Sequence, residues 1–287
     1  MLVALLFGIL ANVIPFIPVD ISSFFLLFAG GLFAGTLGAL LGLGGGIILI
    51  PFLTLVMGLP MHQAIATSIT AVIATSTAGA AMNIQRKTVN IKLGMVLETT
   101  TVAGAIAGGF TATLLSGEIL TRIFGILLVV VAAFMGWRSR FHSSAPSAAK
   151  GAISGTYVDE ITGNTMEYTV QHLPAVMAVS LLAGNISGLL GVGGGIFKVP
   201  AMNLLSRIPL KAAAATSNFM IGVTAAASAF IYFAHGYVNP GVTSSAILGV
   251  LTGSFIGVWL SSKIRTRVLT WIFIGVLLFV AFQLFTR

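Results

Sequence analysis

Two short stretches combine glycine and proline inside apolar segments of the sequence. Residues 42–51 read GLGGGIILIP and residues 191–200 read GVGGGIFKVP. Successive glycines followed by a proline are costly within a helix, so we expect a helix to break at each stretch and to restart after it. Free backbone N–H groups at the start of a helix favour an anion, and glycine lets a ligand approach the backbone. The glycines of this predicted anion site are Gly44, Gly45, Gly46, Gly193, Gly194 and Gly195.

The alternative role for these glycines is tight helix packing, which small residues provide in many membrane proteins. Lys198 favours a binding site, because a charge near the middle of a membrane usually faces a cavity or a partner. In the alternative, its ammonium snorkels to the cytoplasmic surface. Hydroxyl and amide side chains near the two stretches could donate hydrogen bonds to an oxyanion, although Ser and Thr also cap helices. These side chains belong to Thr67, Ser68, Asn185, Thr216, Ser217 and Asn218.

Glu98 is the candidate for coupling transport to an ion. If an anion moves together with protons, a carboxylate within a span could take up the proton. The alternative position for Glu98 is near the membrane interface, where it would be paired with a cation or solvated.

The residue inventory argues against metal, cofactor and enzyme chemistry. The chain has no cysteine, four histidines and six acidic residues, which leaves little material for a metal cluster. We expect no metal, no cofactor and no catalytic residues, because the histidines fall at predicted helix ends or loops rather than inside spans. The net charge of +8 comes from Lys and Arg between apolar runs, so it predicts membrane topology and not nucleic-acid binding.

The composition predicts an all-α polytopic membrane protein of the cytoplasmic membrane, in contact with the lipid bilayer along its spans. Hydrophobic residues make up 57% of the chain and charged residues 7%, which is too apolar for one soluble core. Most apolar runs are long enough to cross a bilayer, but 47–59 and 196–206 are too short to cross alone. Because these short runs follow the glycine stretches, we predict broken or re-entrant helices there, with the two turns meeting near the midplane.

The chain aligns with itself at an offset of 149 residues. At this offset, 12 of the 27 positions between 42 and 68 are identical, and glycines and threonines stay in phase as far as Thr121 and Thr270. An internal duplication explains such a match better than shared apolar composition does. Lys and Arg fall in opposite sets of loops in the two copies. For example, Arg86 and Lys87 follow residue 85, whereas the corresponding loop of the second copy, residues 235–241, has no Lys or Arg. We therefore predict two repeats of inverted topology.

These patterns divide the chain into four parts. Residues 1–21 form an N-terminal apolar segment, which is a short extra span, a signal peptide or an interfacial segment. Residues 22–140 are the first membrane repeat and residues 173–287 the second. Residues 141–172 are a cytoplasmic linker, in which strands on either side of a two-residue turn at Gly163 and Asn164 predict a β-hairpin.

The doubled Gly-x-Gly-Gly-Gly-x-x-x-x-Pro motif, with a polar linker between its copies, resembles the TauE/SafE sulfite exporter family of membrane transporters. The resemblance extends from about Phe24 to the C-terminus. It implies export or uptake of small sulfur-containing or organic anions, such as sulfite, sulfoacetate and related sulfonates, and of the two directions we expect export. Lys198 departs from the first copy, which has Leu49 at that place.

The sequence thus predicts a secondary transporter of a small anion that works by alternating access around the two glycine turns. Two alternatives are an anion channel and a transporter of another small carboxylate or sulfur compound. The absence of a ring of charge or of a continuous polar stripe along any span disfavours the channel.

Overall fold

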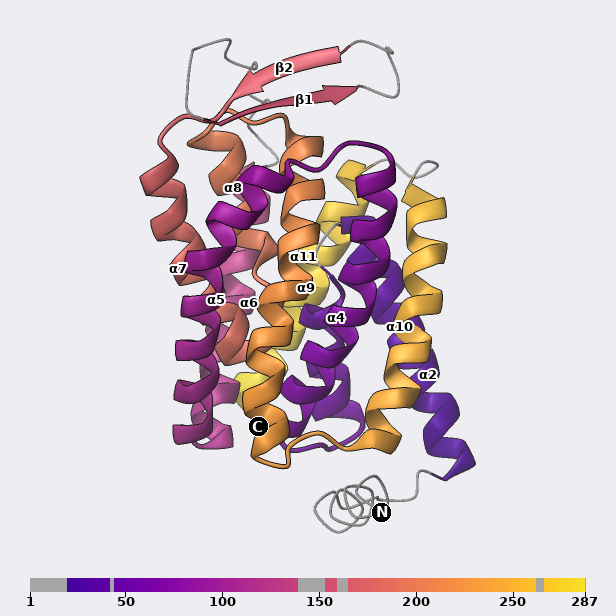
Figure 1. Cartoon of the computed structure of the whole chain (residues 1–287). Helices are drawn as coiled ribbons and strands as arrows, with labels where there is room; N and C mark the ends of the chain where they lie inside the picture. The colour runs from indigo at the N-terminus through magenta and orange to yellow at the C-terminus, as the bar shows by residue number, and fades with distance from the viewer. Residues whose placement is uncertain (1–19, 42–43, 139–152, 159–164, 262–265, 287) are drawn as a thin grey trace, which may run out of the picture.

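The chain folds into one bundle of helices with two strands across one end (Figure 1). The computed structural model describes residues 20–41, 44–138, 153–158, 165–261 and 266–286. The helices of the first half are α2 (Ile21–Leu41), α3 (Gly46–Pro51), the π-helix η1 (Phe52–Val56), α4 (Met61–Gln85), α5 (Ile91–Leu114) and α6 (Gly117–Arg138). After strands β1 (Ser154–Val158) and β2 (Thr165–Thr169) come α7 (Leu173–Leu190), α8 (Gly195–Leu204), α9 (Leu210–Ala234), α10 (Pro240–Ser261) and α11 (Thr266–Thr286).

This architecture confirms the predicted all-α polytopic membrane protein. Among the described residues, seven helices are long and apolar enough to cross a bilayer: α2, α4, α5, α6, α7, α9 and α10. Large apolar side chains such as Phe110, Phe230 and Phe282 are exposed on the outside of the bundle, where lipid would cover them. The predicted apolar segment at residues 1–19 lies outside the described residues.

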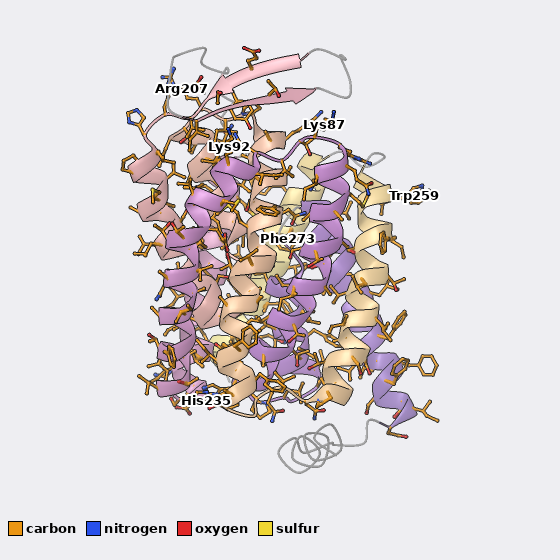
Figure 2. All side chains as sticks on the ribbon, viewed as in Figure 1. Lys87, Lys92, Arg207, His235, Trp259 and Phe273 are labelled. Atoms are coloured by element: carbon orange, nitrogen blue, oxygen red, sulfur yellow. The ribbon has the colours of Figure 1, made fainter. Side chains whose placement is uncertain are left out.

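The distribution of charge gives the bundle an orientation in the membrane. Lys87, Lys92 and Arg207 lie at the end that carries the strands, and His235 lies at the opposite end (Figure 2). Lys and Arg collect on the cytoplasmic side of membrane proteins, so we expect the end that carries the strands to face the cytoplasm, and we call it the cytoplasmic end.

The two glycine stretches interrupt pairs of helices as the sequence predicted. Helix α7 begins next to the strands and ends at Leu190, and α8 returns to the cytoplasmic end near Arg207 (Figure 2). Each short helix keeps a proline as its sixth residue, Pro51 in α3 and Pro200 in α8. Because proline has no N–H to donate, it widens or weakens the turn around it, and in the first copy the chain continues as the π-helix η1.

Corresponding helices of the two halves match in their bounds and run in opposite directions. Adding 149 to the bounds of α4 (61 and 85) gives the bounds of α9 (210 and 234). Helix α4 ends near Lys87 at the cytoplasmic end, whereas α9 begins near Arg207 at that end and finishes at His235 on the other side (Figure 2). The two helices pack on each other through the middle of the bundle.

Close glycine contacts repeat at the same offset. Gly104 and Gly108 of α5 lie against the backbone carbonyls of Leu181 and Asn185 on α7. In the other half, Gly253 and Gly257 of α10 lie against the carbonyls of Leu32 and Thr36 on α2. Each residue of the first set becomes its counterpart in the second when 149 is added or subtracted. Helices α2 and α7 thus each pack on a helix of the opposite half, at positions that only glycine leaves open.

The strands form the predicted hairpin, but the prediction of its turn was wrong. Thr165 pairs with Val158, whereas a two-residue turn at Gly163 and Asn164 would pair Thr165 with residue 162. The register is fixed by the pair Gly155 and Tyr168. A Cβ atom at position 155 would lie 2.7 Å from the Tyr168 ring. The residue that pairs with Tyr168 must therefore be glycine to leave room for that ring.

Tyr168 anchors the hairpin to the membrane helices. Its side chain is buried, and its hydroxyl accepts a hydrogen bond from Asn90 Nδ2 at 3.4 Å. Burial raises the pKa of Tyr168 above its usual range, so the hydroxyl stays protonated. Tyr168 and Val170 belong to an apolar cluster that includes Leu93 of α5 and Met202 of α8. The hairpin therefore packs directly on the cytoplasmic ends of the helices that carry Glu98 and Lys198.

Candidate functional site

Both glycine turns depend on backbone conformations that favour glycine. Gly44 and Gly45 have φ values of 75° and 79°, and Gly193 and Gly194 have 82° and 66°. Gly45 is the N-cap of α3 and Gly194 is the N-cap of α8, and no side chain caps either helix. Residues with a side chain rarely adopt a positive φ, so these turns favour glycine. Because glycine has no side chain that could accept a hydrogen bond, the first N–H groups of each short helix are not capped by a side chain.

The two turns meet inside the bundle. A Cβ at Gly46 would lie 2.7 Å from the carbonyl oxygen of Gly191 and 2.7 Å from Ser68 Oγ. Ser68 Oγ donates a hydrogen bond of 2.8 Å to the same Gly191 oxygen, which joins α4 to the end of α7. On the other side of this turn, the Tyr232 hydroxyl lies 3.0 Å from the Gly188 oxygen. The predicted meeting of the turns is therefore present in the structure.

Lys198 is fully buried and takes part in a polar chain across three helices. Its Nζ donates to Thr224 Oγ1 at 3.1 Å, and Thr224 Oγ1 donates to Glu98 Oε1 at 2.6 Å. Glu98 lies on α5, Lys198 on α8 and Thr224 on α9. Glu98 is 7% exposed, so its carboxylate is buried within the protein rather than solvated. One hydroxyl thus connects a buried cation to a buried carboxylate.

Two buried oxygens near this chain have no hydrogen-bond partner among the described residues. They are Glu98 Oε2 and Ser180 Oγ. On α7, Gly184 lies one turn after Ser180 and packs against the carbonyl of Thr101 on α5. Thr101 lies one turn after Leu97, the neighbour of Glu98, so Ser180 and Glu98 lie at similar levels of the two packed helices. An unpaired buried polar oxygen costs about 1–3 kcal/mol, which indicates that a further proton, water or ligand belongs here.

Lys198 extends back over the second glycine turn. A Cβ at Gly194 would lie 3.2 Å from Lys198 Cε and 2.9 Å from the Ala183 oxygen. The ammonium therefore lies near the N-terminus of α8, which carries a partial positive charge from the helix dipole. Two positive features at one place require a negative partner, and in this structure Glu98 provides it.

The first turn borders a small cavity of about 90 Å³, which lies between α2, α4, α9 and α10. A cavity of this size has room for ordered water or for one small oxyanion. Its polar lining consists of Thr75, Asn218 and Ser254, together with the backbone of Gly44. Lys198 does not line this cavity.

The cavity and the polar chain occupy corresponding places in the two halves. Gly44 and Thr75 line the cavity at the first turn. Adding 149 to each number gives Gly193 and Thr224, which lie at the second turn and in the polar chain. The position that corresponds to Lys198 is Leu49, so the lysine side chain occupies space at the second turn alone. The two turns therefore differ chemically: the first borders the cavity, and the second carries the charge of Lys198.

The remaining predicted site residues divide between the cavity and helix contacts. Asn218 lines the cavity, whereas Thr67 Oγ1 contacts Thr243 Oγ1 of α10 at 3.3 Å. Thr216 Oγ1 accepts a hydrogen bond from the Asn90 backbone N–H at 3.0 Å and so supports the start of α5. The backbone of Asn185 packs on Gly108. These contacts place Thr67, Thr216 and Asn185 in helix packing.

Ser217 differs from its neighbour Thr216. Its Oγ is buried and has no hydrogen-bond partner among the described residues. Gly195 begins α8, directly after the turn formed by Gly193 and Gly194.

Thr224 is the residue that sequence reasoning missed. The signal that could have found it is the helical spacing of polar residues in an apolar segment. Ser217, Thr224 and Ser228 are separated by seven and four residues, which puts them on one face of α9, and all three are buried. Polar side chains on one buried face of a membrane helix indicate a functional interior.

Replacing Thr224 with valine tests the polar chain. The variant keeps the shape of the side chain but removes both hydroxyl contacts and leaves the buried Lys198 and Glu98 without their shared partner. We expect a loss of about 2–4 kcal/mol in the free energy of unfolding, because hydrogen bonds to buried charged groups are lost. Thr224→Ser keeps the hydroxyl and should lose less than about 1.5 kcal/mol. Denaturation of the purified protein measures both, and a Thr224→Val variant as stable as wild type would show that the hydroxyl does not stabilise the polar chain.

The family model described as "Sulfite exporter TauE/SafE" matches residues 27–284 of this chain. This range covers both glycine turns, the polar chain and the hairpin. No solved structure matches the chain.

Individual relatives are named as transporters. The chain is 31% identical over 269 residues to the probable membrane transporter protein YunE of Bacillus subtilis, covering 91% of this chain and 97% of YunE. It is 28% identical over 236 residues to a probable membrane transporter protein of Xylella fastidiosa, covering 82% and 83% of the two chains. It is 24% identical over 257 residues to the probable membrane transporter protein MJ0441 of Methanocaldococcus jannaschii, covering 84% and 88%. The chain therefore belongs to the TauE/SafE sulfite exporter family of membrane transporters.

Proposed function

We propose that the protein is a secondary transporter that moves a small anion of the sulfite or sulfonate class out of the cell, with the anion bound where the two glycine turns meet. The observation that supports this most strongly is the position of Lys198. Its side chain is fully buried and lies near an uncapped helix N-terminus. A fixed positive charge and free N–H groups at one place match the needs of an oxyanion.

The size and lining of the neighbouring cavity support a small substrate. A volume of about 90 Å³ next to Gly44 suits a small anion. Asn218 offers an amide donor, which can replace part of the hydration shell of an oxyanion. We place the path of the anion between this cavity and Lys198, because the two turns touch at Gly46 and Gly191.

The transport cycle that we propose is alternating access between two inverted repeats. The matched bounds of α4 and α9 and the repeated glycine contacts of α5 and α10 support the repeat division at 22–140 and 173–287. In such folds one repeat rocks against the other around a site near the midplane.

The inverted topology predicts that corresponding loops face opposite sides of the membrane. Lys87 and His235 are exposed, and they belong to the loops that follow α4 and α9. Because the chain has no native cysteine, Lys87→Cys and His235→Cys can each be labelled alone. In intact cells, an impermeant maleimide should label His235→Cys at once and Lys87→Cys only after permeabilisation. Labelling of both from outside would refute the inverted arrangement.

Binding of the anion is tested most simply by its effect on stability. A ligand that binds only the folded state adds about 2.7 kcal/mol at a concentration of 100 times its Kd. We expect sulfite, thiosulfate, sulfoacetate or acetate to raise the melting temperature of the purified protein, whereas sodium and choline chloride at the same ionic strength should not. If none of the four anions exceeds the chloride salts, the proposed site is wrong.

A further inference from the structure

We propose that Glu98 Oε2 binds a proton that travels with the anion, so that the protein couples anion movement to proton movement. This inference rests on the function proposed above and adds the coupling ion to it. It follows from the position of one carboxylate in relation to one lysine and one hydroxyl.

The first step concerns the open acceptor of Glu98. Oε1 accepts the Thr224 hydroxyl at 2.6 Å, while Oε2 has no hydrogen-bond partner among the described residues. A carboxylate oxygen without a donor is costly inside a protein, and a proton on Oε2 removes that cost. Glu98 can take this proton without disturbing the Thr224 contact, because the two oxygens are separate acceptors.

The second step concerns the other charges that face Glu98. Helix α7 has no ionisable side chain along its length, and the only one on α8 is Lys198. On α9 the ionisable side chains are Lys211 in the first turn and Tyr232 in the last turn, far from Thr224 along the helix. On α5 itself, Lys92 lies in the exposed first turn. Within the described helices around Glu98, Lys198 is therefore the charged group whose electrostatic interactions change when Glu98 is protonated.

The third step is the balance of charge at the site. With Glu98 ionised, its negative charge and the positive charge of Lys198 cancel, and the hydroxyl of Thr224 holds the two side chains together. When a proton from water forms an O–H bond with Oε2, the carboxylate becomes a neutral acid. Lys198 and the N-terminus of α8 then lack a negative partner, and an incoming anion supplies one. Release of the anion allows Glu98 to lose the proton and to pair with Lys198 again.

The consequence is that one proton accompanies each anion that binds at Lys198. The first glycine turn cannot provide a second such site. Leu49 stands there in place of the lysine, and the position that corresponds to Glu98 is Ile247. Coupling is therefore a property of the second glycine turn. Proton and anion move in the same direction.

The test uses proteoliposomes that contain the whole protein and the pH dye pyranine, with the membrane potential clamped by potassium and valinomycin. Potassium thiosulfate, sulfoacetate or methanesulfonate is added outside; all three remain anionic between about pH 6 and about pH 8. We expect at least one of them to enter wild-type vesicles and to acidify their interior. Its affinity, measured by thermal shift, should fall up to about tenfold per pH unit as the pH rises.

Glu98→Gln fixes the neutral state of this side chain, and Glu118→Gln makes the same chemical change at an exposed residue at the start of α6. The Glu98 variant should lose both the acidification and the dependence of affinity on pH, while the Glu118 variant should keep both. If Glu98→Gln does not fold, the acidification seen with wild type decides whether a proton accompanies the anion.

Three results are distinguishable. Acidification and pH dependence that disappear only in Glu98→Gln support the proton site. Entry of an anion without acidification in wild type, or an affinity that does not change with pH, overturns the proton site and leaves the proposed function intact. If none of the three anions binds or enters, the proposed function fails, and the proton site fails with it.

Discussion

Replacing Lys198 with methionine is expected to lower anion transport at least about 30-fold, because a buried charge that contacts the anion contributes about 2–5 kcal/mol to binding. Methionine keeps the length and the apolar character of the lysine stem, so the space over the second glycine turn stays filled. The same change at Lys92, which is exposed in the first turn of α5, is the matched control and should alter transport less than twofold. Uptake of radiolabelled sulfite or thiosulfate into proteoliposomes measures both variants.

The stability of the Lys198 variant separates loss of binding from loss of folding. Removing one member of a buried charge pair destabilises a protein by about 3–5 kcal/mol, since the other charge is left without compensation. The double variant Lys198→Met with Glu98→Gln carries no buried charge and should recover most of this stability, but not transport. If the double variant is as unstable as the single one, the two side chains are not coupled in the way that the Thr224 bridge implies.

Gly46→Ala is expected to damage the contact between the two turns. The new Cβ would lie 2.7 Å from the Gly191 oxygen and 2.7 Å from Ser68 Oγ, so either the turns separate or the hydrogen bond from Ser68 is lost. Overpacking of this kind costs about 1–3 kcal/mol. We expect transport to fall at least about tenfold, because the proposed anion path passes between the turns.

Gly275→Ala is the control for this substitution. Gly275 lies inside α11, and a Cβ at this position meets no atom within 4 Å. Alanine favours a helix over glycine by about 0.5–1 kcal/mol, so this variant should be as stable as wild type or more stable, with normal transport. Similar losses in Gly46→Ala and Gly275→Ala would mean that the contact at Gly191 has no special role.

Features that depend on nearby residues could be predicted from the sequence. The breaks before α3 and α8 follow from successive glycines and a proline, which disfavour a helix whatever surrounds them. The spans follow from length and hydrophobicity, and the cytoplasmic end follows from residues such as Lys87 and Arg207. The sequence also favoured an interior position for Lys198 over snorkelling, because Lys198 lies one turn beyond a break in a segment too short to cross the membrane.

Features that depend on contacts between distant segments could not be predicted. The Thr224 hydroxyl reaches Glu98, which is 126 residues away in the chain, and no local pattern records that meeting. For the same reason, the sequence left open whether Glu98 lies at the interface. The turn of the hairpin was misplaced because Gly163 and Asn164 favour a turn locally, whereas the packing of Tyr168 against Gly155 sets the register.

The central claim is that an anion binds at the glycine turns and is carried through them. Counterflow tests it most directly: proteoliposomes loaded with unlabelled sulfite or sulfoacetate are diluted into a trace of the same radiolabelled anion, with wild type and Lys198→Met compared. A carrier exchanges anions one for one, so we predict saturable accumulation of label above equilibrium in wild type and none in the variant. Flux that does not saturate, that shows no exchange and that is the same in both proteins would contradict this account.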